Sequence, residues 1–285
     1  MGRFSNSLDL AKHSWSVLRD DKELAAIPVA SAATCTVIAL AFGGAAYFSL
    51  DRIADPAPGQ DALQATPLTW VVGIVGLFFV GIAAQYFAAV LIAGASERLA
   101  GGDPSLGSAL AKANTRFGAL VGWAALNVTV GLILSFIRDK VGPLGDIATR
   151  LVGAAWNIVT WLAVPVIVEE GAGPIHSAKR SAQLLRTTWG ENITGQFGLG
   201  LVGLLAVLPG LVVFGLVSLA IPLLGIPLLV IYLAIVMTIM AALGGIYRAA
   251  LYRYAVGLPN GDTFPERALA GAFRQKGTKA TGLLR

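Results

Sequence analysis

The sequence predicts an all-α fold, a polytopic membrane helix bundle with six transmembrane helices. Of its 285 residues, 56% are hydrophobic and only 13% are charged, whereas soluble domains carry about 25% charged residues. A globule of this length cannot bury so much apolar surface, so a large soluble helical core is the disfavoured alternative. We expect one integral membrane domain over residues 1–285.

The transmembrane spans are predicted from runs of residues that contain no charged side chain. These runs are Leu24–Leu50, Ala62–Ser96, Phe117–Ile137, Leu151–Val168 and Asn192–Tyr247. Because about 20 apolar residues cross the hydrocarbon core, each of the first four runs holds one span. The fifth would be about 84 Å long as a single helix, which suits two spans. The turn between them is predicted at Pro222 and Pro227, around Gly225.

Basic residues gather on alternate segments between the spans. The N-terminus, Glu97–Arg116, Glu169–Glu191 and the C-terminal segment from Arg248 carry seventeen of the 21 Lys and Arg residues. Positive residues accumulate on the cytoplasmic side of membrane proteins, so both termini are expected in the cytoplasm. This asymmetry accounts for the net charge of +5, and we expect no nucleic-acid partner.

The N-terminus, Met1–Glu23, is predicted to form an amphipathic helix. One face carries apolar residues at helical spacing, namely Phe4, Leu8, Ala11, Trp15 and Leu18. With Trp on that face and basic residues beside it, the helix would lie in the lipid headgroups. Packing against the mouth of the bundle is an equal alternative. A signal peptide is not expected, because the apolar run starts late and is too long.

The first two spans enclose an acidic, proline-rich loop that should be irregular, and the second span carries Gln85. An interhelical hydrogen bond is the structural explanation for this glutamine. A second amphipathic helix is predicted to start at Pro104 and Ser105, with one apolar face made of Leu106, Leu110, Ala113 and Phe117.

The third span contains Asn127 and a GxxxG spacing at Gly118 and Gly122, which indicates close helix packing. A short outer loop, Arg138–Arg150, precedes the fourth span. That span carries Asn157, and Pro165 is expected to kink it just before the next polar segment.

The later elements follow the same alternation of polar segment and span. The fifth span begins near Gln196, and the sixth ends near Arg253. Around that end an interfacial belt is predicted, made of Tyr247, Tyr252, Tyr254, Arg248 and Arg253. A last amphipathic helix is expected over residues 264–275, with Phe264, Leu269 and Phe273 inward, followed by a loose tail, 276–285.

Two polar segments resemble each other. Ala11–Glu23 (AKHSWSVLRDDKE) and Ala178–Gly190 (AKRSAQLLRTTWG) share Ala, Lys, Ser, Leu and Arg without a gap, and the middle segment shares Ala111–Lys112. In this alignment the apolar face of the later segment is made of Ile175, Ala178, Ala182, Leu185 and Trp189. We therefore predict a three-fold parallel repeat of an amphipathic helix plus two spans, over about 1–96, 103–168 and 174–255. Parallel repeats occur in transporter folds, although a common requirement for headgroup helices would also produce these matches.

The stretches AKHSWSVLRDDKEL, GDPS and VPVIVEEGAGPIHSAKRSAQLLRTTWGE carry a family resemblance. They resemble a family of uncharacterised bacterial six-span membrane proteins, a domain of unknown function. The arrangement is more distantly similar to the membrane domain fused to some glycerophosphodiester phosphodiesterases. The resemblance implies a protein of the bacterial cytoplasmic membrane and no activity, since the phosphodiesterase's catalytic domain and its acidic metal ligands are absent here.

Glu169 and Glu170 are the strongest candidates for a functional site. At a kinked span end, with Lys179 and Arg180 nine or ten residues on, they suit a proton or cation site. Structural ion pairing is the favoured alternative. The candidate polar cluster also takes in Trp189 and Glu191.

No catalytic motif accompanies these carboxylates. The chain lacks HExxH, GxxxxGK[ST] and GxSxG, and its histidines, His13 and His176, are far apart. Its one cysteine, Cys35, lies in the first span. We therefore expect no catalytic residue, no metal site and no cofactor.

Three functional hypotheses remain. The favoured one is a non-enzymatic membrane protein whose basic inner helices contact anionic lipid or organise a partner, either another membrane protein or a second copy of the chain. The second is a small secondary transporter, or permease-like protein, with a polar pathway at mid-membrane. Its candidate residues are Gln85, Asn127, Asn157 and Gln196. The third, an intramembrane enzyme, lacks a paired nucleophile and base.

Overall fold

The structure, a computed structural model, describes residues 12–19, 22–52, 63–141, 143–189, 198–260 and 269. Residues 12–19 form a helical segment. The elements that follow are α2 (Lys22–Phe48), β1 (Asp51–Arg52), β2 (Leu63–Gln64), α3 (Pro67–Leu99), α4 (Leu106–Asn114), α5 (Phe117–Val141), α6 (Pro143–Val159), α7 (Ala163–Glu170), α8 (Pro174–Trp189), α9 (Gly198–Ala220) and α10 (Pro222–Ala255).

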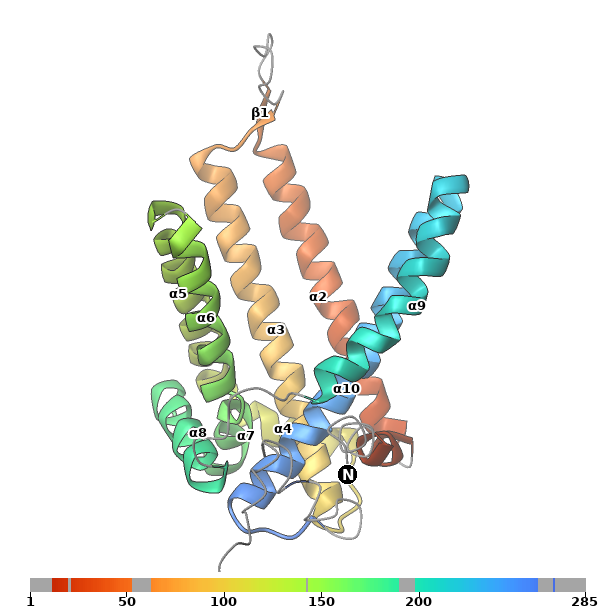
Figure 1. Cartoon of the computed structure of the whole chain (residues 1–285). Helices are drawn as coiled ribbons and strands as arrows, with labels where there is room; N and C mark the ends of the chain where they lie inside the picture. The colour runs from red at the N-terminus through yellow and green to blue at the C-terminus, as the bar shows by residue number, and fades with distance from the viewer. Residues whose placement is uncertain are drawn as a thin grey trace, which may run out of the picture.

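The all-α membrane fold is confirmed. Within the described residues, six helical stretches are long and apolar enough to cross a membrane, so the chain is a multi-pass membrane protein. They run as three hairpins, α2 with α3, α5 with α6–α7, and α9 with α10, and α3 contacts two of the neighbouring hairpins (Figure 1). The short antiparallel pair of β1 and β2 closes the first hairpin at the far end. No strand was predicted there.

The core is concentrated at one end of the bundle, where the segment 12–19, α4, α7, α8 and the last turns of α3 and α10 pack together. We call this the basic end, because most of the described Lys and Arg residues lie there. Towards the other end the hairpins diverge (Figure 1) and large apolar side chains stay exposed, Leu223 at 90% and Phe48 at 86%. Such surfaces are stable in hydrocarbon and not in water.

Two helix boundaries differ from the sequence prediction. The predicted outer loop Arg138–Arg150 is largely helical, because α5 continues to Val141 and α6 begins at Pro143. Asp146 and Arg150 form an i,i+4 ion pair of 2.9 Å along α6. In the fourth span the irregularity is a break at residues 160–162, ahead of Pro165, which lies inside α7. The predicted kink is therefore real but lies further from Glu169 than expected.

The buried faces of the amphipathic helices are rotated from those predicted. On α8 the buried side chains are Ser177, Ser181, Leu184 and Leu185, while Ile175 is 64% exposed. On the segment 12–19 they are Ser14, Val17 and Leu18, and Trp15 is 48% exposed. On α4 the capping box of Ser105 with Ser108 confirms the predicted start. Ala113 is buried as predicted, but so is Ala109, and the predicted Leu106 and Phe117 are exposed.

The shared residues of the two similar segments occupy equivalent environments. Ser14 and its counterpart Ser181 are both fully buried, and Leu18 and its counterpart Leu185 are both buried. This is the pattern expected if both helices dock the same way onto the bundle. The three-fold repeat itself stays a prediction.

The last span also departs from expectation at both of its ends. The turn before α10 is at Ile221 alone, with Pro222 in its first turn, while Gly225 and Pro227 lie inside the helix. At the other end Tyr247 and Tyr252 are buried at 2% and 4%. They belong to the core of the basic end, so the predicted interfacial belt is wrong there.

Several predicted features fall outside the described residues. They are the side chain of Trp189, Glu191, Gln196, the tail 276–285 and all of the helix 264–275 except Leu269. Leu269 is fully buried in the core cluster, as its predicted inward position requires.

Candidate functional site

Glu169 and Glu170 lie at the end of α7 in a set of ion pairs at the basic end. The Nζ of Lys112, on α4, donates to Glu169 Oε2 at 2.7 Å. The Nε of Arg180, on α8, donates to Glu170 Oε1 at 3.1 Å, and the Tyr252 hydroxyl of α10 donates to the same oxygen at 3.1 Å. The two carboxylates thus join four helices, a structural role, and Glu169 Oε1 is buried without a hydrogen-bond partner among the described residues.

The cation paired with Glu169 differs from the one that spacing suggested. Lys179 is exposed and has no ion pair among the described residues, so its predicted place opposite the carboxylates is wrong. Lys112 takes that place because α4 packs across the end of α3, beside α7 (Figure 1). Lys112 and Glu169 are 57 residues apart in the sequence, so local spacing gave no indication of this ion pair.

A break in the fourth span shapes the site next to these carboxylates. Between α6 and α7 the i to i−4 hydrogen bonding is interrupted, which frees backbone groups in a buried place. The hydroxyl of Ser181, on α8, forms hydrogen bonds with two of these backbone groups. It donates to the carbonyl of Val159 at 2.7 Å and accepts from the Leu162 N–H at 3.0 Å. Trp161 is thereby held in the break and not inside a regular helix.

A polar cavity of about 560 Å³ lies beside this break, between α3, α5, α6 and α10. Its lining includes three of the predicted intramembrane polar residues, Gln85, Asn127 and Asn157, together with Thr160, Trp161 and Arg248. The structure therefore brings together polar residues from separate spans, which the sequence identified only as individual candidates. Glu169 and Glu170 are not among the lining residues.

The polar side chains of this cavity differ in how they are bonded. Asn127 is held in place, since its Nδ2 donates to the Trp123 carbonyl at 3.0 Å and its Oδ1 accepts from Trp156 Nε1 at 3.1 Å. Gln85 and Asn157 form no side-chain hydrogen bond within the described part of the chain, contrary to the interhelical bond expected of Gln85. Their amides remain available to a ligand.

Arg248 was not singled out by sequence reasoning as a site residue. Its guanidinium carbon lies 4.0 Å from the centre of the Trp161 ring, a cation–π contact. Its Nε is buried and has no hydrogen-bond partner in the described part of the chain. The described residues offer it no ion pair. One signal was present in the sequence, because Arg248 follows the longest charge-free run and has no carboxylate three or four residues away.

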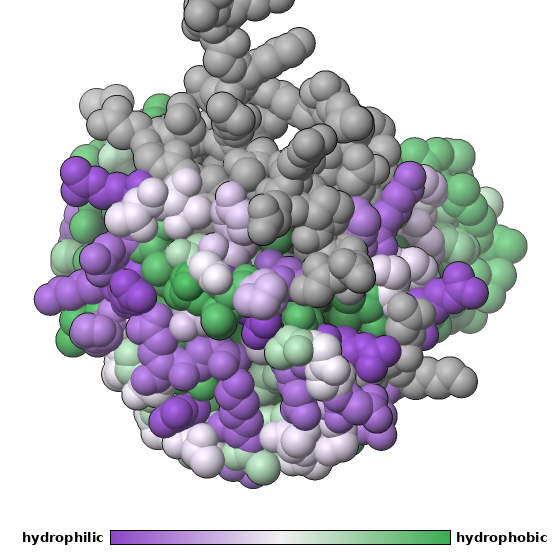
Figure 2. Space-filling view, turned by 90° about the horizontal axis from the view of Figure 1, so that it is seen from below, coloured by the Kyte–Doolittle hydropathy of each residue, from purple (hydrophilic) through white to green (hydrophobic). Residues whose placement is uncertain are grey.

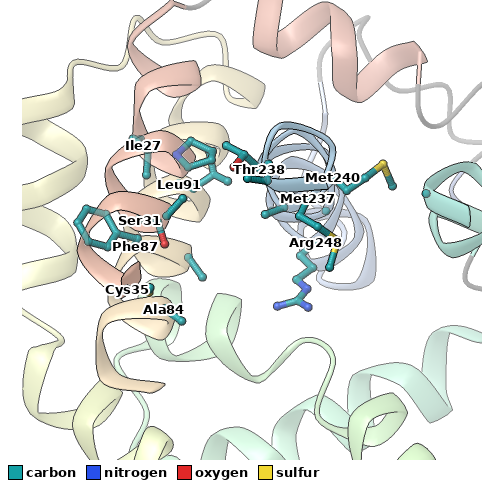
Figure 3. A pocket seen from close by; sticks show the side chains of 18 of the residues that line it. Ile27, Ser31, Cys35, Ala84, Phe87, Leu91, Met237, Thr238, Met240 and Arg248 are labelled. Carbon is teal, nitrogen blue, oxygen red and sulfur yellow. Dashed lines mark hydrogen bonds between the residues drawn. The ribbon is translucent and has the colours of Figure 1, made fainter. Parts of the chain in front are cut away.

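A second, larger cavity of about 870 Å³ shares Trp161 and Arg248 with the polar one. It lies between the α2–α3 hairpin and the α9–α10 hairpin and is lined mainly by apolar and small side chains. Figure 3 shows Ile27, Ser31, Cys35 and Phe87 on one side and the α10 residues, Arg248 included, on the other. Arg248 therefore stands between an apolar space and a polar one.

A profile of a protein family of unknown function (DUF6159) matches residues 69–262, more than half of the chain. The chain belongs to this family. The DUF6159 region includes α3 to α10, with both the GDPS and the Glu169–Glu191 stretches, and it begins after the AKHSWSVLRDDKEL stretch. Every residue of the polar cavity lies inside it, whereas the α2 wall of the larger cavity does not. No curated protein and no solved structure matches the chain.

Proposed function

We propose that this DUF6159 protein is a non-enzymatic protein of the bacterial cytoplasmic membrane that contacts anionic lipid with its basic end, which faces the cytoplasm. One observation carries the proposal. Lys12 and Arg19 on the segment 12–19, and Lys179 and Arg186 on α8, are all exposed and have no ion pair among the described residues. These are the two basic positions that the similar segments share.

The spacing of these side chains suits a charged surface. In each helix the two basic residues are seven positions apart, which is two turns or about 10 Å along one face. The opposite face of each helix is the one buried against the bundle. Among the coloured residues of Figure 2, hydrophilic ones predominate over the lower half of the basic end, with apolar ones across its middle and at its right-hand edge. Each Lys or Arg near an anionic leaflet contributes about 1 kcal/mol of attraction, so four together would give a clear preference.

The experiment compares two variants of the full chain that each lose four positive charges. One carries Gln at Lys12, Arg19, Lys179 and Arg186, and the matched control carries Gln at Arg52, Arg138, Lys140 and Arg150. Thirteen basic residues would still oppose four in the first variant, so the topology is kept. Each protein is extracted with its surrounding lipid in polymer-bounded discs, and the ratio of phosphatidylglycerol to phosphatidylethanolamine is measured.

We expect the ratio to fall towards that of the bulk membrane in the first variant and to stay at the wild-type value in the control. Equal ratios in all three proteins would overturn the proposal. A ratio that falls only in the control would mean that the other end of the bundle makes the contact.

A second candidate function, solute transport, is favoured by the polar cavity of Gln85, Asn127, Asn157, Thr160 and Arg248. A transport pathway must open to each side of the membrane in turn. Asn157→Cys in a Cys35→Ala background reports this through its reaction with a membrane-impermeant maleimide. Reaction from both sides would support transport, and reaction from one side or neither would leave lipid contact as the sole function.

A further inference from the structure

Arg248 lacks the counter-charge that an arginine at membrane depth requires. Intramembrane cations pair with carboxylates, with backbone carbonyls or with a ligand. The carboxylates of α7 bond other groups, Glu169 Oε2 with Lys112 and Glu170 with Arg180 and Tyr252. Glu169 Oε1 is buried without a described partner, and neither carboxylate forms an ion pair with Arg248 among the described residues. Arg248 makes one described contact, with the Trp161 ring, which supplies a π face and no negative charge.

Arg248 lies near the end of α10 that belongs to the basic end. It lies four residues before Tyr252, whose hydroxyl reaches Glu170 at the end of α7. Four residues of helix correspond to about 6 Å. The backbone of Arg248 is therefore about one turn further from the basic end than that of Tyr252, and a long basic side chain near a span end can reach the headgroup region.

The larger cavity continues from Arg248 towards the other end of the bundle. Its volume of about 870 Å³ is within the ~300–1,000 Å³ typical of small-molecule sites. Its walls are apolar side chains such as Ile27, Phe87, Leu91 and Met237, which cannot satisfy water or a second charged group. Figure 3 shows these walls on both sides of the gap, with Arg248 at its edge.

From this juxtaposition we propose that the chain binds one anionic glycerophospholipid, with the phosphate on Arg248 and an acyl chain in the cavity between the two hairpins. A guanidinium can donate two parallel hydrogen bonds to a phosphate. The unbonded amides of Gln85 and Asn157, on the polar side of Arg248, face the polar part of the headgroup. A free anion would leave the apolar cavity unfilled, and a zwitterionic or neutral lipid would leave Arg248 without a full counter-charge.

This intramembrane site is distinct from the exposed basic residues of the proposed function, and it is tested on the full chain in detergent. The fraction of protein with bound lipid is measured by native mass spectrometry after addition of phosphatidylglycerol, phosphatidylcholine, or glycerophosphoglycerol, which is the headgroup without its chains. The wild type should prefer phosphatidylglycerol to phosphatidylcholine and should bind glycerophosphoglycerol weakly.

Three variants separate the parts of the site. Arg248→Gln should lose the preference for phosphatidylglycerol, with affinity falling about ten-fold or more, as expected when a charge-assisted hydrogen bond is removed. Arg248→Lys should keep part of the preference for phosphatidylglycerol, because a lysine ammonium keeps the positive charge but cannot donate two parallel hydrogen bonds to the phosphate. Ser31→Phe fills the cavity and leaves Arg248 in place. It should weaken the binding of both diacyl lipids and leave the binding of glycerophosphoglycerol unchanged.

The proposal is overturned if Arg248→Gln keeps the wild-type preference, or if glycerophosphoglycerol binds as tightly as the lipid, which would indicate a site for a free anion. Should Arg248→Gln fail to fold, Ser31→Phe decides the question, because unchanged lipid binding in it would also refute the site. The Lys179→Gln, Arg186→Gln double variant keeps the cavity intact. Its loss of lipid enrichment with retained one-lipid binding would separate the two proposals.

Discussion

The Ser181→Ala variant tests how the broken fourth span is held. Removal of the hydroxyl takes away the donor to the Val159 carbonyl and the acceptor for the Leu162 N–H. The Leu162 N–H would be left unpaired where Leu162 and Ser181 are fully buried, whereas Val159 is 40% exposed, so its carbonyl is only partly shielded. Because a buried group without a partner costs about 1–3 kcal/mol, the expected loss in the free energy of unfolding is about 1–3 kcal/mol.

Ser14→Ala is the matched control for this experiment. Ser14 occupies the equivalent position in the segment 12–19 and is also fully buried, but its Oγ has no hydrogen-bond partner among the residues that the structure describes. Its removal should be neutral or slightly stabilising, because a buried unpaired hydroxyl is itself a cost. The two serines therefore have the same burial and opposite expected effects.

The assay is reversible unfolding of each protein in mixed micelles with increasing dodecyl sulfate, followed by circular dichroism. Amide hydrogen exchange at Leu162 gives a local readout, and its protection should fall in Ser181→Ala and stay unchanged in Ser14→Ala. If the two variants lose the same stability, or if Leu162 stays protected without Ser181, then the break is held by the packing of α7 and not by this hydroxyl.

Three further substitutions test close contacts by the same unfolding assay. Gly225→Ala would place a Cβ 2.7 Å from the Val217 carbonyl carbon, against backbone that cannot move aside. It should cost about 1–3 kcal/mol or more, whereas Gly215→Ala, with nothing within 4 Å, should not destabilise. Gly171→Ala should cost at least about 1 kcal/mol, because Gly171 has φ +68° and its Cβ would meet the Arg116 guanidinium. Gly173→Ala, in open space, is its control. Glu170→Gln should cost about 1 kcal/mol, since its pair with Arg180 is partly exposed, and the double variant with Arg180→Gln should cost less than the sum of the two single variants.

The spans were predictable because their signal is local. An apolar run such as Leu24–Leu50 must be helical in hydrocarbon, where each backbone group has to be bonded within its own segment. The start of α4 was also local, since the Ser105 capping box lies within four residues. These features follow from chain neighbours alone.

The buried faces were not predictable in the same way, and the reason is physical. In water an exposed Ile175 would be unfavourable, so hydrophobicity indicates the inward face. At a membrane an apolar side chain is equally stable facing lipid, and the close docking surface goes to small residues such as Ser177 and Ser181. The predicted face of α8 therefore placed Ile175 inward, and the structure turned it out.

The site was predictable only in part. Gln85, Asn127 and Asn157 stood out as polar residues within spans, and the structure gathers them around one cavity. Arg248 was assigned to an interfacial belt because its neighbours are tyrosines. The break at residues 160–162 was signalled by Pro165 in the same span, but the contact of Arg248 with Trp161 and the bonding of the break by Ser181 come from other helices. Contacts of this kind have no signal in the local sequence.

The most direct test of the central claim, that Arg248 and the cavity between the two hairpins bind one anionic lipid, is an experimental structure of the full chain in discs that contain phosphatidylglycerol. Our account predicts a headgroup phosphate about 3 Å from the Arg248 guanidinium and an acyl chain between α2 and α10. A cavity that holds only hydrocarbon chains, with no headgroup at Arg248, or hairpins that close over an empty gap, would contradict it.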